Sequence, residues 1–229
     1  MSDVPPKAGP AKPRADDHIA KARAAILAAA LPNVAFDGWT TKVMADAAAA
    51  AGVSHGQMRL AFPGGVIDLV DCFLADGDRR MGEALSKRDF GALKIRERIT
   101  LGVRTRIEVD LKDREAVRRA VTLLALPLSG TTGPQALYRT VDAIWRAVGD
   151  ISTDFNFYTK RAILAGVYST VLITWFGDES EDYADTWAFL DARIGDVMQI
   201  EKAKASVKKL TAFLPDPFAL LGKLRYRKS

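Results

Sequence analysis

The side chains best placed to do chemistry lie in one short stretch that ends at Arg161. Asp150 and Asp154 closely precede Lys160 and Arg161, and carboxylates beside basic groups can act as an acid–base set when their pKa values are perturbed. The same residue types also cap a helix and form ion pairs at its first turn. Because an apolar run follows directly, we favour a cap and an ion-pair network at the start of a buried helix.

The rest of the sequence offers no second candidate for catalysis or for a cofactor. It contains two histidines, His18 and His55, and one cysteine, Cys72. These cannot supply the Cys/His spacing of a zinc site, and neither a glycine-rich phosphate loop nor a Ser/His/Asp set is present. Cys72 is expected to pack as a small apolar side chain. We therefore predict a protein that is not an enzyme and that needs no metal or cofactor.

Composition favours an all-helical protein with a substantial core. Of the 229 residues, 48% are apolar, alanine, leucine and arginine dominate, and no alternating strand pattern is evident. A single cysteine excludes an intramolecular disulfide and suggests a reducing compartment. Residues 1–17 are rich in proline, alanine and lysine, so we expect a disordered tail, not a signal or transit peptide.

The positive charge is concentrated at one end of the chain. The formal net charge is +5, and residues 202–229 alone carry a net +7, so the remainder is slightly acidic. A protein that binds nucleic acid through its body should be basic where the phosphates lie. This distribution therefore indicates a function for the tail and argues against a nucleic-acid-binding body.

The apolar run that follows Arg161 is the element around which the chain is organised. No charged side chain occurs between Arg161 and Asp178, which predicts a helix buried on all sides. It is shorter than the roughly 20 apolar residues of a membrane span, so we expect a core or interface helix. The next helix, Tyr183 to Met198, also carries an apolar stripe. Two such helices in succession favour a homodimer with a four-helix interface.

The residues from 18 to 65 have the spacing of a helix-turn-helix module. A first helix, His18 to Leu31, should end at Pro32, and a second should run from Thr40 or Thr41 to about Ala51, with Gly52 as its stop. Ser54 then caps a short third helix.

The charges of this module do not favour DNA binding. Between Asp37 and Gly65 they sum to zero, whereas a recognition helix is normally flanked by several basic residues. Met58 and Leu60 are suited to packing. We therefore expect no nucleic acid partner.

Four further helices should build a larger domain, residues 66–200. They are expected over Val66 to Leu85, over Lys94 to Asp110, from Arg114 to just before Pro127, and over Ala136 to Val148, with a loop over Ser129 to Pro134. On the second of them we expect a solvated face bearing Arg96, Arg98, Arg104 and Arg106.

Trp145 stands beside Asp142 and Arg146 in the last of these helices. An aromatic residue between an acid and an arginine on a partly exposed face has the composition of a binding hot spot. Burial of Trp145 in the core is an equally open reading of the pattern.

The tail, residues 201–229, combines apolar and basic residues. A helix over Lys202 to Leu214 would have one apolar side and one lysine-rich side, and the mixture resumes after Pro217. Such a helix lies in the interface of an anionic membrane; the alternative is a helix packed on its own domain. The expected membrane-binding residues are Val207, Lys208, Lys209, Leu210, Phe213, Leu214, Phe218, Leu221, Lys223 and Arg225.

A long motif near the middle of the chain resembles that of the ninth coenzyme Q biosynthesis protein family. The motif is Asp142-x-x-Trp145-x-x-x-Gly149-Asp150-x-Ser152-Thr153-Asp154-Phe155-Asn156-x-Tyr158-Thr159-Lys160-Arg161. Shorter matches are Ile26-Leu27, Phe36 to Thr40, Leu124 to Pro127, Thr186-Trp187-x-Phe189-Leu190 and Arg193-Ile194, so the resemblance spans most of residues 24–200.

The resemblance implies a TetR-like helical fold in a lipid-binding accessory protein of ubiquinone synthesis. Such proteins are usually dimeric, peripheral to membranes, and partners of the di-iron demethoxyubiquinone hydroxylase. For this chain it implies a bacterial member at the cytoplasmic face of the inner membrane. It further implies a pocket for an isoprenoid quinone precursor or a phospholipid, lined by Leu123, Leu126, Ile144, Ile163, Val167, Val171 and Trp175.

In the same family, Asp142 and Trp145 match the hydroxylase-binding surface. Arg146 stands where the eukaryotic relatives tend to carry an aromatic residue. Our hypothesis is therefore that the dimer takes a quinone precursor from the membrane and presents it to the hydroxylase near Asp142, Trp145 and Arg146. The alternative is a TetR-type transcriptional repressor in which the same pocket holds an inducer.

Overall fold

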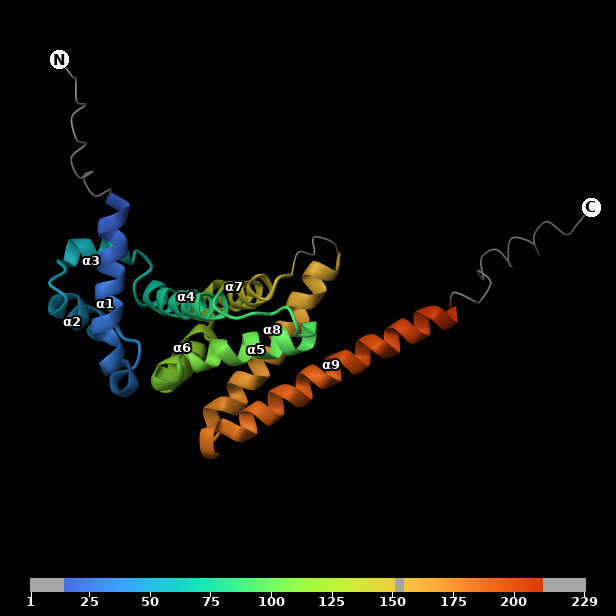
Figure 1. The fold of residues 1–229 in the computed structure, drawn as a ribbon. Helices are drawn as coiled ribbons and strands as arrows, with labels where there is room; N and C mark the ends of the chain where they lie inside the picture. The colour runs from blue at the N-terminus through green and yellow to red at the C-terminus, as the bar shows by residue number, and fades with distance from the viewer. Residues whose placement is uncertain (1–14, 151–154, 212–229) are drawn as a thin grey trace, which may run out of the picture.

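The computed structural model describes residues 15–150 and 155–211, and in these ranges the regular structure is helical (Figure 1). This confirms the all-α prediction. The first helices form a small module of three: α1 (Ala15–Asp37), α2 (Thr41–Ala50) and α3 (His55–Ala61). The remainder forms a larger bundle of α4 (Val66–Leu85), α5 (Ile95–Glu108), α6 (Arg114–Leu124), α7 (Thr132–Ala147), α8 (Phe155–Gly177) and α9 (Ala184–Thr211). Short 3-10 turns, Leu111–Asp113, Pro127–Ser129 and Glu181–Tyr183, lie at three of the connections.

The helix-turn-helix prediction agrees with the structure in its caps. Thr40 accepts a hydrogen bond from the Val43 amide and starts α2, and Gly52 has the positive φ of +66° expected at a helix stop. Ser54 and Gln57 form a capping box at the start of α3. These local signals fixed the helix ends within about one residue.

The expected end of the first helix at Pro32 was wrong, because α1 continues to Asp37. Pro32 is exposed and Val34 is fully buried, so the last turn of α1 still presents its apolar side to the core. An internal proline costs about 3 kcal/mol or more, and burial of Val34 together with the packing of α1 against α2 and α3 offsets that cost.

On α3, only one of the two residues expected to pack does so. Met58 is buried, but Leu60 is 68% exposed, since positions two apart on a helix point to different sides. The exposed part of α3 therefore presents Arg59 and Leu60 side by side.

The module is joined to the bundle by Trp39. Its indole nitrogen donates a hydrogen bond of 3.0 Å to the carbonyl oxygen of Ala116 in α6. Its ring also packs against Phe73 of α4, with the ring centroids 5.2 Å apart. Because Trp39 is buried by elements of both parts, the module and the bundle share one continuous core.

Within the bundle, α5 packs against α4, α7 and α9. Arg106 was expected on its solvated face, and this was wrong. The Arg106 side chain is almost completely buried and pairs with Asp78 and Asp110. Gly77 of α4 makes room for it, since a Cβ there would lie 2.6 Å from Arg106 Nη2. Arg104, by contrast, is exposed as predicted.

The connection between α6 and α7 lies earlier in the chain than the loop expected over Ser129 to Pro134. A 3-10 turn covers Pro127–Ser129, and α7 begins at Thr132, ahead of Pro134. A proline near the start of a helix is tolerated because the amides of the first turn have no helical partner.

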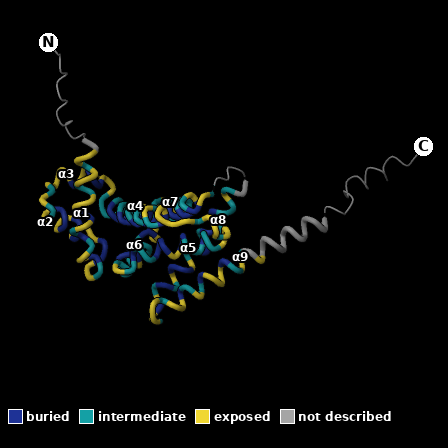
Figure 2. Tube along the Cα trace, in the orientation of Figure 1, coloured by how far each residue is buried: buried dark blue, intermediate teal, exposed yellow. Residues whose placement is uncertain are grey.

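Helix α8 is less enclosed than the charge-free sequence predicted. Leu164, Val167, Tyr168, Val171, Leu172 and Trp175 are buried, but Ala162, Gly166, Thr170 and Ile173 are exposed along one side. Figure 2 shows the bundle helices burying the faces that they turn toward one another. The expectation of burial on all sides was therefore wrong for this single chain.

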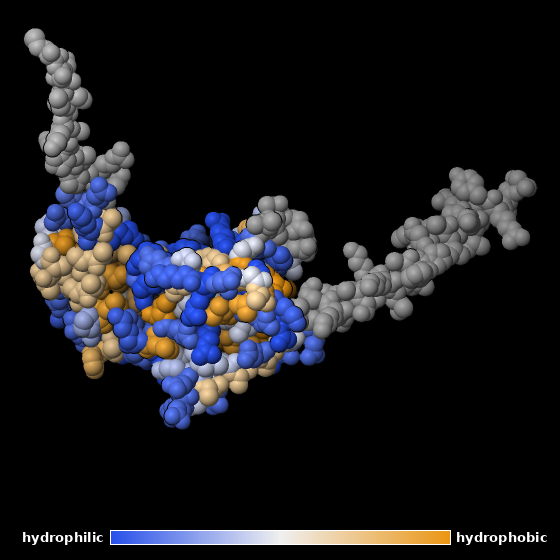
Figure 3. Space-filling view, viewed as in Figure 1, coloured by the Kyte–Doolittle hydropathy of each residue, from blue (hydrophilic) through white to orange (hydrophobic). Residues whose placement is uncertain are grey.

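Helix α9 continues without a break from Ala184 to Thr211. Residues 202–211 thus extend the helix expected over Tyr183 to Met198, and they do not form a separate helix that begins at Lys202. In Figure 1 this helix (orange to red) runs along α8 and then projects beyond the bundle. Figure 3 shows hydrophilic side chains over much of one face of the bundle, with hydrophobic patches exposed between them.

One segment among the described residues, Asp17–Asp37, is long and apolar enough to cross a membrane by length and composition. It belongs to α1, in which Ile26, Leu27 and Ala30 are buried in the module. The packing of this face gives the apolar sequence a role in the core.

Candidate functional site

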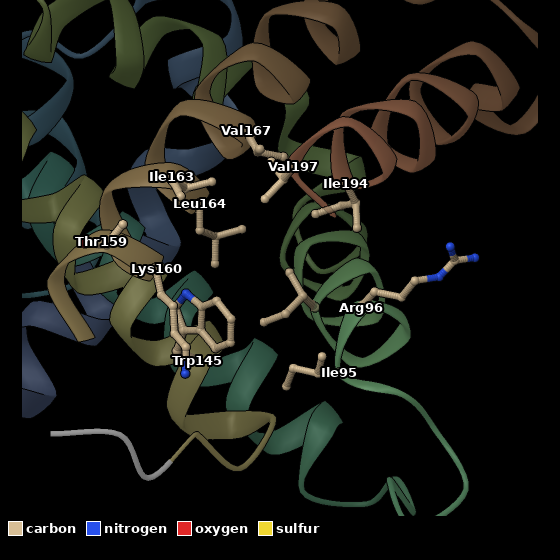
Figure 4. Close-up of a pocket in the computed structure, with 11 residues that line it drawn as sticks. Ile95, Arg96, Trp145, Thr159, Lys160, Ile163, Leu164, Val167, Ile194 and Val197 are labelled. Carbon is tan, nitrogen blue, oxygen red and sulfur yellow. The ribbon is translucent and has the colours of Figure 1, made fainter. Parts of the chain in front are cut away.

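An apolar pocket of about 330 Å³ opens between α5, α7, α8 and α9 (Figure 4). Its volume is at the lower end of the range of ligand pockets, about 300–1,000 Å³. We call it the first pocket. It is lined by Ile95, Arg96, Ile99, Trp145, Thr159, Lys160, Ile163, Leu164, Val167, Ile194 and Val197.

Helical spacing brings these side chains onto facing surfaces. Thr159, Ile163 and Val167 follow one another at intervals of four on α8, and Ile95 and Ile99 do so on α5. Residues four apart lie on one face of a helix. Ile194 and Val197 complete the pocket from α9, so three helices contribute aliphatic walls.

Trp145 closes the pocket on the α7 side. Its side chain is only 8% exposed, and the Lys160 ammonium lies 5.3 Å from the ring centroid. The attraction between an ammonium group and an indole face is worth about 0.5–2 kcal/mol. Figure 4 shows Lys160 extended beside the indole ring, whereas the Arg96 guanidinium points away from the other lining residues. The interior is therefore apolar, with a cationic group at one edge.

Beneath this edge, a buried ion-pair network fixes the start of α8. Arg161, almost fully buried, contacts Asp142 at 2.7 Å and Asp150 at 3.4 Å, and Lys160 contacts Asp150 at 3.0 Å. The Arg161 guanidinium also lies over the Phe157 ring. The ion pairs predicted for Asp150, Lys160 and Arg161 are thus confirmed, whereas Asp154 lies outside the described residues. Arg161 ties α8 to α7 and so holds two walls of the pocket together.

The structure divides the predicted lipid-binding residues into three groups. Ile163 and Val167 line the first pocket. Ile144, Val171 and Trp175 are fully buried in the closed core. Trp175, near the end of α8, also packs against the ring of Tyr183, with the ring centroids 6.4 Å apart. The remaining two, Leu123 and Leu126, lie near Trp39 at the junction with the module, in a separate shallow depression.

Trp145 does not lie on a partly exposed face: it is buried, as the core reading predicted. It follows Val141 by four residues and shares that buried face of α7. Asp142 is mostly buried in the ion pairs with Arg146 and Arg161. The Arg146 side chain is 72% exposed. Of the three predicted partner-binding residues, only Arg146 is therefore freely accessible.

Several residues that line the first pocket were not among the predicted lipid-binding residues. Ile95, Ile99, Ile194 and Val197 are apolar residues at helical spacing, but periodicity indicates only which face of a helix is buried. It does not distinguish a face that is packed from one that borders a cavity.

The predicted membrane-binding residues lie at the end of α9 or beyond it. Val207, Lys208, Lys209 and Leu210 belong to α9, and their side chains are not described. Phe213, Leu214, Phe218, Leu221, Lys223 and Arg225 lie outside the described residues. Among the residues that the structure does describe, no group of His, Cys, Asp and Glu could hold a metal ion.

The fold is that of a TetR-type helical protein. A crystal structure of the TetR transcriptional regulator from Nitrosomonas europaea superposes with a TM-score of 0.61. The alignment covers 76% of this chain and 95% of that chain at 22% sequence identity. At this identity the likeness concerns the fold alone.

Sequence comparison shows the family. The model of the COQ9 family matches residues 131–201. The mitochondrial ubiquinone biosynthesis protein COQ9 of Rattus norvegicus is 34% identical over 190 residues, which cover 80% of this chain and 61% of that protein. The Homo sapiens protein of the same name is 32% identical over 80% of this chain and 59% of its own length. The chain belongs to the COQ9 family of ubiquinone biosynthesis proteins, and it spans about three fifths of the length of these relatives.

Proposed function

We propose that the first pocket binds part of the apolar chain of a lipid, either an isoprenoid quinone precursor or a phospholipid, and that the protein is a non-catalytic accessory of ubiquinone biosynthesis. The observation that carries the proposal is a pocket with aliphatic walls from α5, α8 and α9 and a cationic group at its edge. Burial of an apolar chain in such a pocket is favourable by about 25 cal/mol for each Å² of surface removed from water. In this arrangement the Lys160 ammonium faces a polar headgroup.

The size of the pocket sets how much of a lipid it can hold. With a volume of about 330 Å³, it accommodates a segment of a long chain, and the rest must stay in the membrane or lie along the protein surface. A pocket of this size suits a protein that engages a lipid while it remains at the bilayer. Complete extraction of a polyisoprenoid would need a larger cavity.

Helix α9 gives the pocket a route to the membrane. Ile194 and Val197 line the pocket, and the same helix leads directly to the lysines from Lys202 onward. We propose that these lysines and the basic residues after Thr211 attract an anionic surface, so that the protein is peripheral to the inner membrane on its cytoplasmic side.

Vesicle sedimentation tests this part of the proposal. The protein should sediment with phosphatidylglycerol vesicles at low salt and stay in solution with purely phosphatidylcholine vesicles. A variant with Lys223, Arg225, Arg227 and Lys228 changed to Gln should lose most of the binding. Equal sedimentation of that variant would reject the role of the tail.

The proposed protein partner is the demethoxyubiquinone hydroxylase, docked over the α7 end of the pocket, with the protein acting as a homodimer. Arg146 supports this placement because its exposed side chain directly follows Trp145, which closes the pocket. Arg146→Glu should weaken capture of the purified hydroxylase by about tenfold through charge reversal at the rim. Arg118→Glu, an exposed change on α6, is the matched control, and equal capture by both variants would reject this surface.

A second candidate, a ligand-responsive transcriptional repressor, is favoured by the helix-turn-helix geometry of α2 and α3. The exposed part of α3 carries Arg59 and the apolar Leu60, which is a poor surface for a phosphate backbone. A gel shift with the DNA upstream of the protein's own gene distinguishes the two functions, and a specific shift would favour the repressor.

A further inference from the structure

A second pocket, of about 360 Å³, opens beside a different face of α8. Its walls are aliphatic and come from α6, α7 and α8, including Leu124, Leu137 and Leu172. At its rim, Ala125, Pro134 and Ile173 are exposed. It shares no lining residue with the first pocket, so it is a separate space with its own chemistry.

Three buried polar side chains line this otherwise apolar pocket: Arg106, Thr140 and Tyr168. Each is at most 5% exposed. Arg106 donates to Asp78 and Asp110 and to the Leu74 carbonyl oxygen, and the Thr140 hydroxyl donates to Asp78 at 2.8 Å. The polar edge of the pocket is therefore held rigidly in place by α4 and α5.

The Tyr168 hydroxyl differs from its neighbours because no hydrogen bond joins it to any residue that the structure describes. The side chain is 95% buried. Among the described residues, the fully enclosed side-chain atoms that lack a hydrogen-bond partner are Trp145 Nε1 and Trp175 Nε1, so the Tyr168 oxygen borders the open space of the pocket. A tyrosine hydroxyl in apolar surroundings usually finds a hydrogen-bond partner. A molecule in the pocket would supply the missing partner.

The charges behind Tyr168 decide which kind of molecule suits it. The network behind it contains four arginines, Arg79, Arg80, Arg106 and Arg139, and five acids, Asp71, Asp76, Asp78, Glu83 and Asp110. Since the carboxylates already outnumber the guanidinium groups, an additional anion is disfavoured. A cation would meet Arg106 at the pocket wall and is disfavoured too. The site suits a neutral ligand.

The protonation state of Tyr168 makes it a donor at neutral pH. Burial raises the pKa of the hydroxyl to about 12, and Asp78 and Asp110 add to the rise against the opposing effect of Arg106. A protonated phenol beside a guanidinium group presents hydrogens to the ligand, so the ligand's complementary group is an acceptor oxygen.

We propose that the second pocket binds a neutral, mainly apolar molecule that carries a carbonyl-type oxygen, and that the Tyr168 hydroxyl donates a hydrogen bond to that oxygen. Ketones, quinones and esters belong to this class. The site goes beyond the proposed function, because it neither uses the first pocket nor depends on what binds there.

Two probes of nearly equal shape test the proposal on the full chain. 2-Acetylnaphthalene carries the carbonyl oxygen and 2-ethylnaphthalene lacks it. Both are titrated while the methyl signals of Leu124 and Leu172 in the second pocket and of Ile163 and Val167 in the first are followed by NMR. The ketone should bind about three- to tenfold more tightly, the factor of one net hydrogen bond, and should shift the signals of Leu124 and Leu172.

Tyr168→Phe removes only the hydroxyl. This variant should bind both probes with nearly equal affinity, at the level of the hydrocarbon in the unchanged protein. Equal affinities in the unchanged protein, a ketone preference that survives in Tyr168→Phe, or shifts confined to Ile163 and Val167 would each overturn the proposal.

A rim variant keeps the test valid if Tyr168→Phe does not fold. Ala125→Trp places a large side chain at the exposed mouth of the second pocket and should abolish the binding of both probes. Thr122→Trp, one turn earlier on α6 and outside this pocket, should retain it. Binding that persists in Ala125→Trp would show that the probes do not occupy this pocket.

Discussion

At the residue scale, Arg161 holds the start of α8 against α7. Its guanidinium group is almost fully buried between Asp142 and Asp150. Breaking a buried pair costs much more than the pair contributes, because the remaining charges stay buried without a full set of partners. The two acids keep Arg146 and Lys160 as further partners, which limits the cost.

We therefore predict that Arg161→Met lowers the free energy of unfolding by about 3 kcal/mol. Arg146→Met is the matched control, since Arg146 pairs with the same Asp142 but its side chain is 72% exposed. Arg146→Met should lower the free energy of unfolding by less than about 1 kcal/mol. Urea unfolding of both variants gives the comparison, and equal losses would contradict the role assigned to Arg161.

Tyr168 should make stability fall at alkaline pH. Its folded-state pKa, about 12, is above the unfolded value of about 10. Between about pH 10 and pH 12, Tyr168 therefore keeps its proton in the folded state and loses it in the unfolded state. This contribution is constant below pH 10 and is lost as the pH rises toward 12.

Between pH 9 and pH 11, the unchanged protein should lose about 1 kcal/mol more than Tyr168→Phe does. Urea unfolding gives the free energy of unfolding of each protein at each pH. The difference between the two proteins cancels the contribution of all other titrating groups. Parallel pH profiles for the two proteins would show that the Tyr168 pKa is not raised.

The same residues show what a sequence can and cannot predict at this scale. An ion-pair network of Asp150 with Lys160 and Arg161 was predictable, because acidic and basic side chains stand together just before an apolar run. The burial of Arg106 was not, because it depends on Gly77 and Asp78, about one helix away in the sequence. Pairing across helices leaves no periodic signal in either helix.

At the scale of helices, Gly77 lets α4 and α5 approach. A Cβ at this position would lie 2.6 Å from Arg106 Nη2, and Arg106 is held by Asp78 and Asp110. Gly77→Ala should therefore destabilise the protein by about 1–3 kcal/mol through overpacking.

Gly82, five residues later on α4, gives a matched control. No atom lies within 4 Å of a Cβ built there, so Gly82→Ala should stabilise by about 0.5–1 kcal/mol through helix propensity. Thermal unfolding measures both changes. The same sign for the two variants would contradict the contact between Gly77 and Arg106.

Helix starts were predicted better than helix lengths. Thr40 and Ser54 are local signals whose effect is decided within one turn. Pro32 and the lysines after Met198 looked like breaks, yet α1 and α9 continue through them. In α1, tertiary packing of Val34 outweighs the local cost of Pro32.

At the scale of the whole molecule, the fold is a TetR-type arrangement in which the first and second pockets both border α8. The all-helical class and the apolar character of α8 and α9 were evident from the sequence. The position of the first pocket was not, because Ile144, Val171 and Trp175 have the same residue types as the pocket walls but are closely packed. Only the three-dimensional spacing of the helices distinguishes the two groups.

The central claim is that the first pocket holds a lipid chain, and two neighbouring residues on α8 allow a sharp test. Ile163 lines the pocket, whereas Ala162 is exposed on another side of the helix. Ile163→Trp should fill the pocket, and Ala162→Trp should add the same bulk outside it.

The measurement is mass spectrometry of the lipids that copurify with each protein, expressed as moles of lipid per mole of protein. Isoprenoid quinone precursors or phospholipids should accompany the unchanged protein and Ala162→Trp in similar amounts, and Ile163→Trp should lose most of them. An unchanged protein that carries no lipid, or an Ile163→Trp variant that carries as much as Ala162→Trp, would contradict the claim.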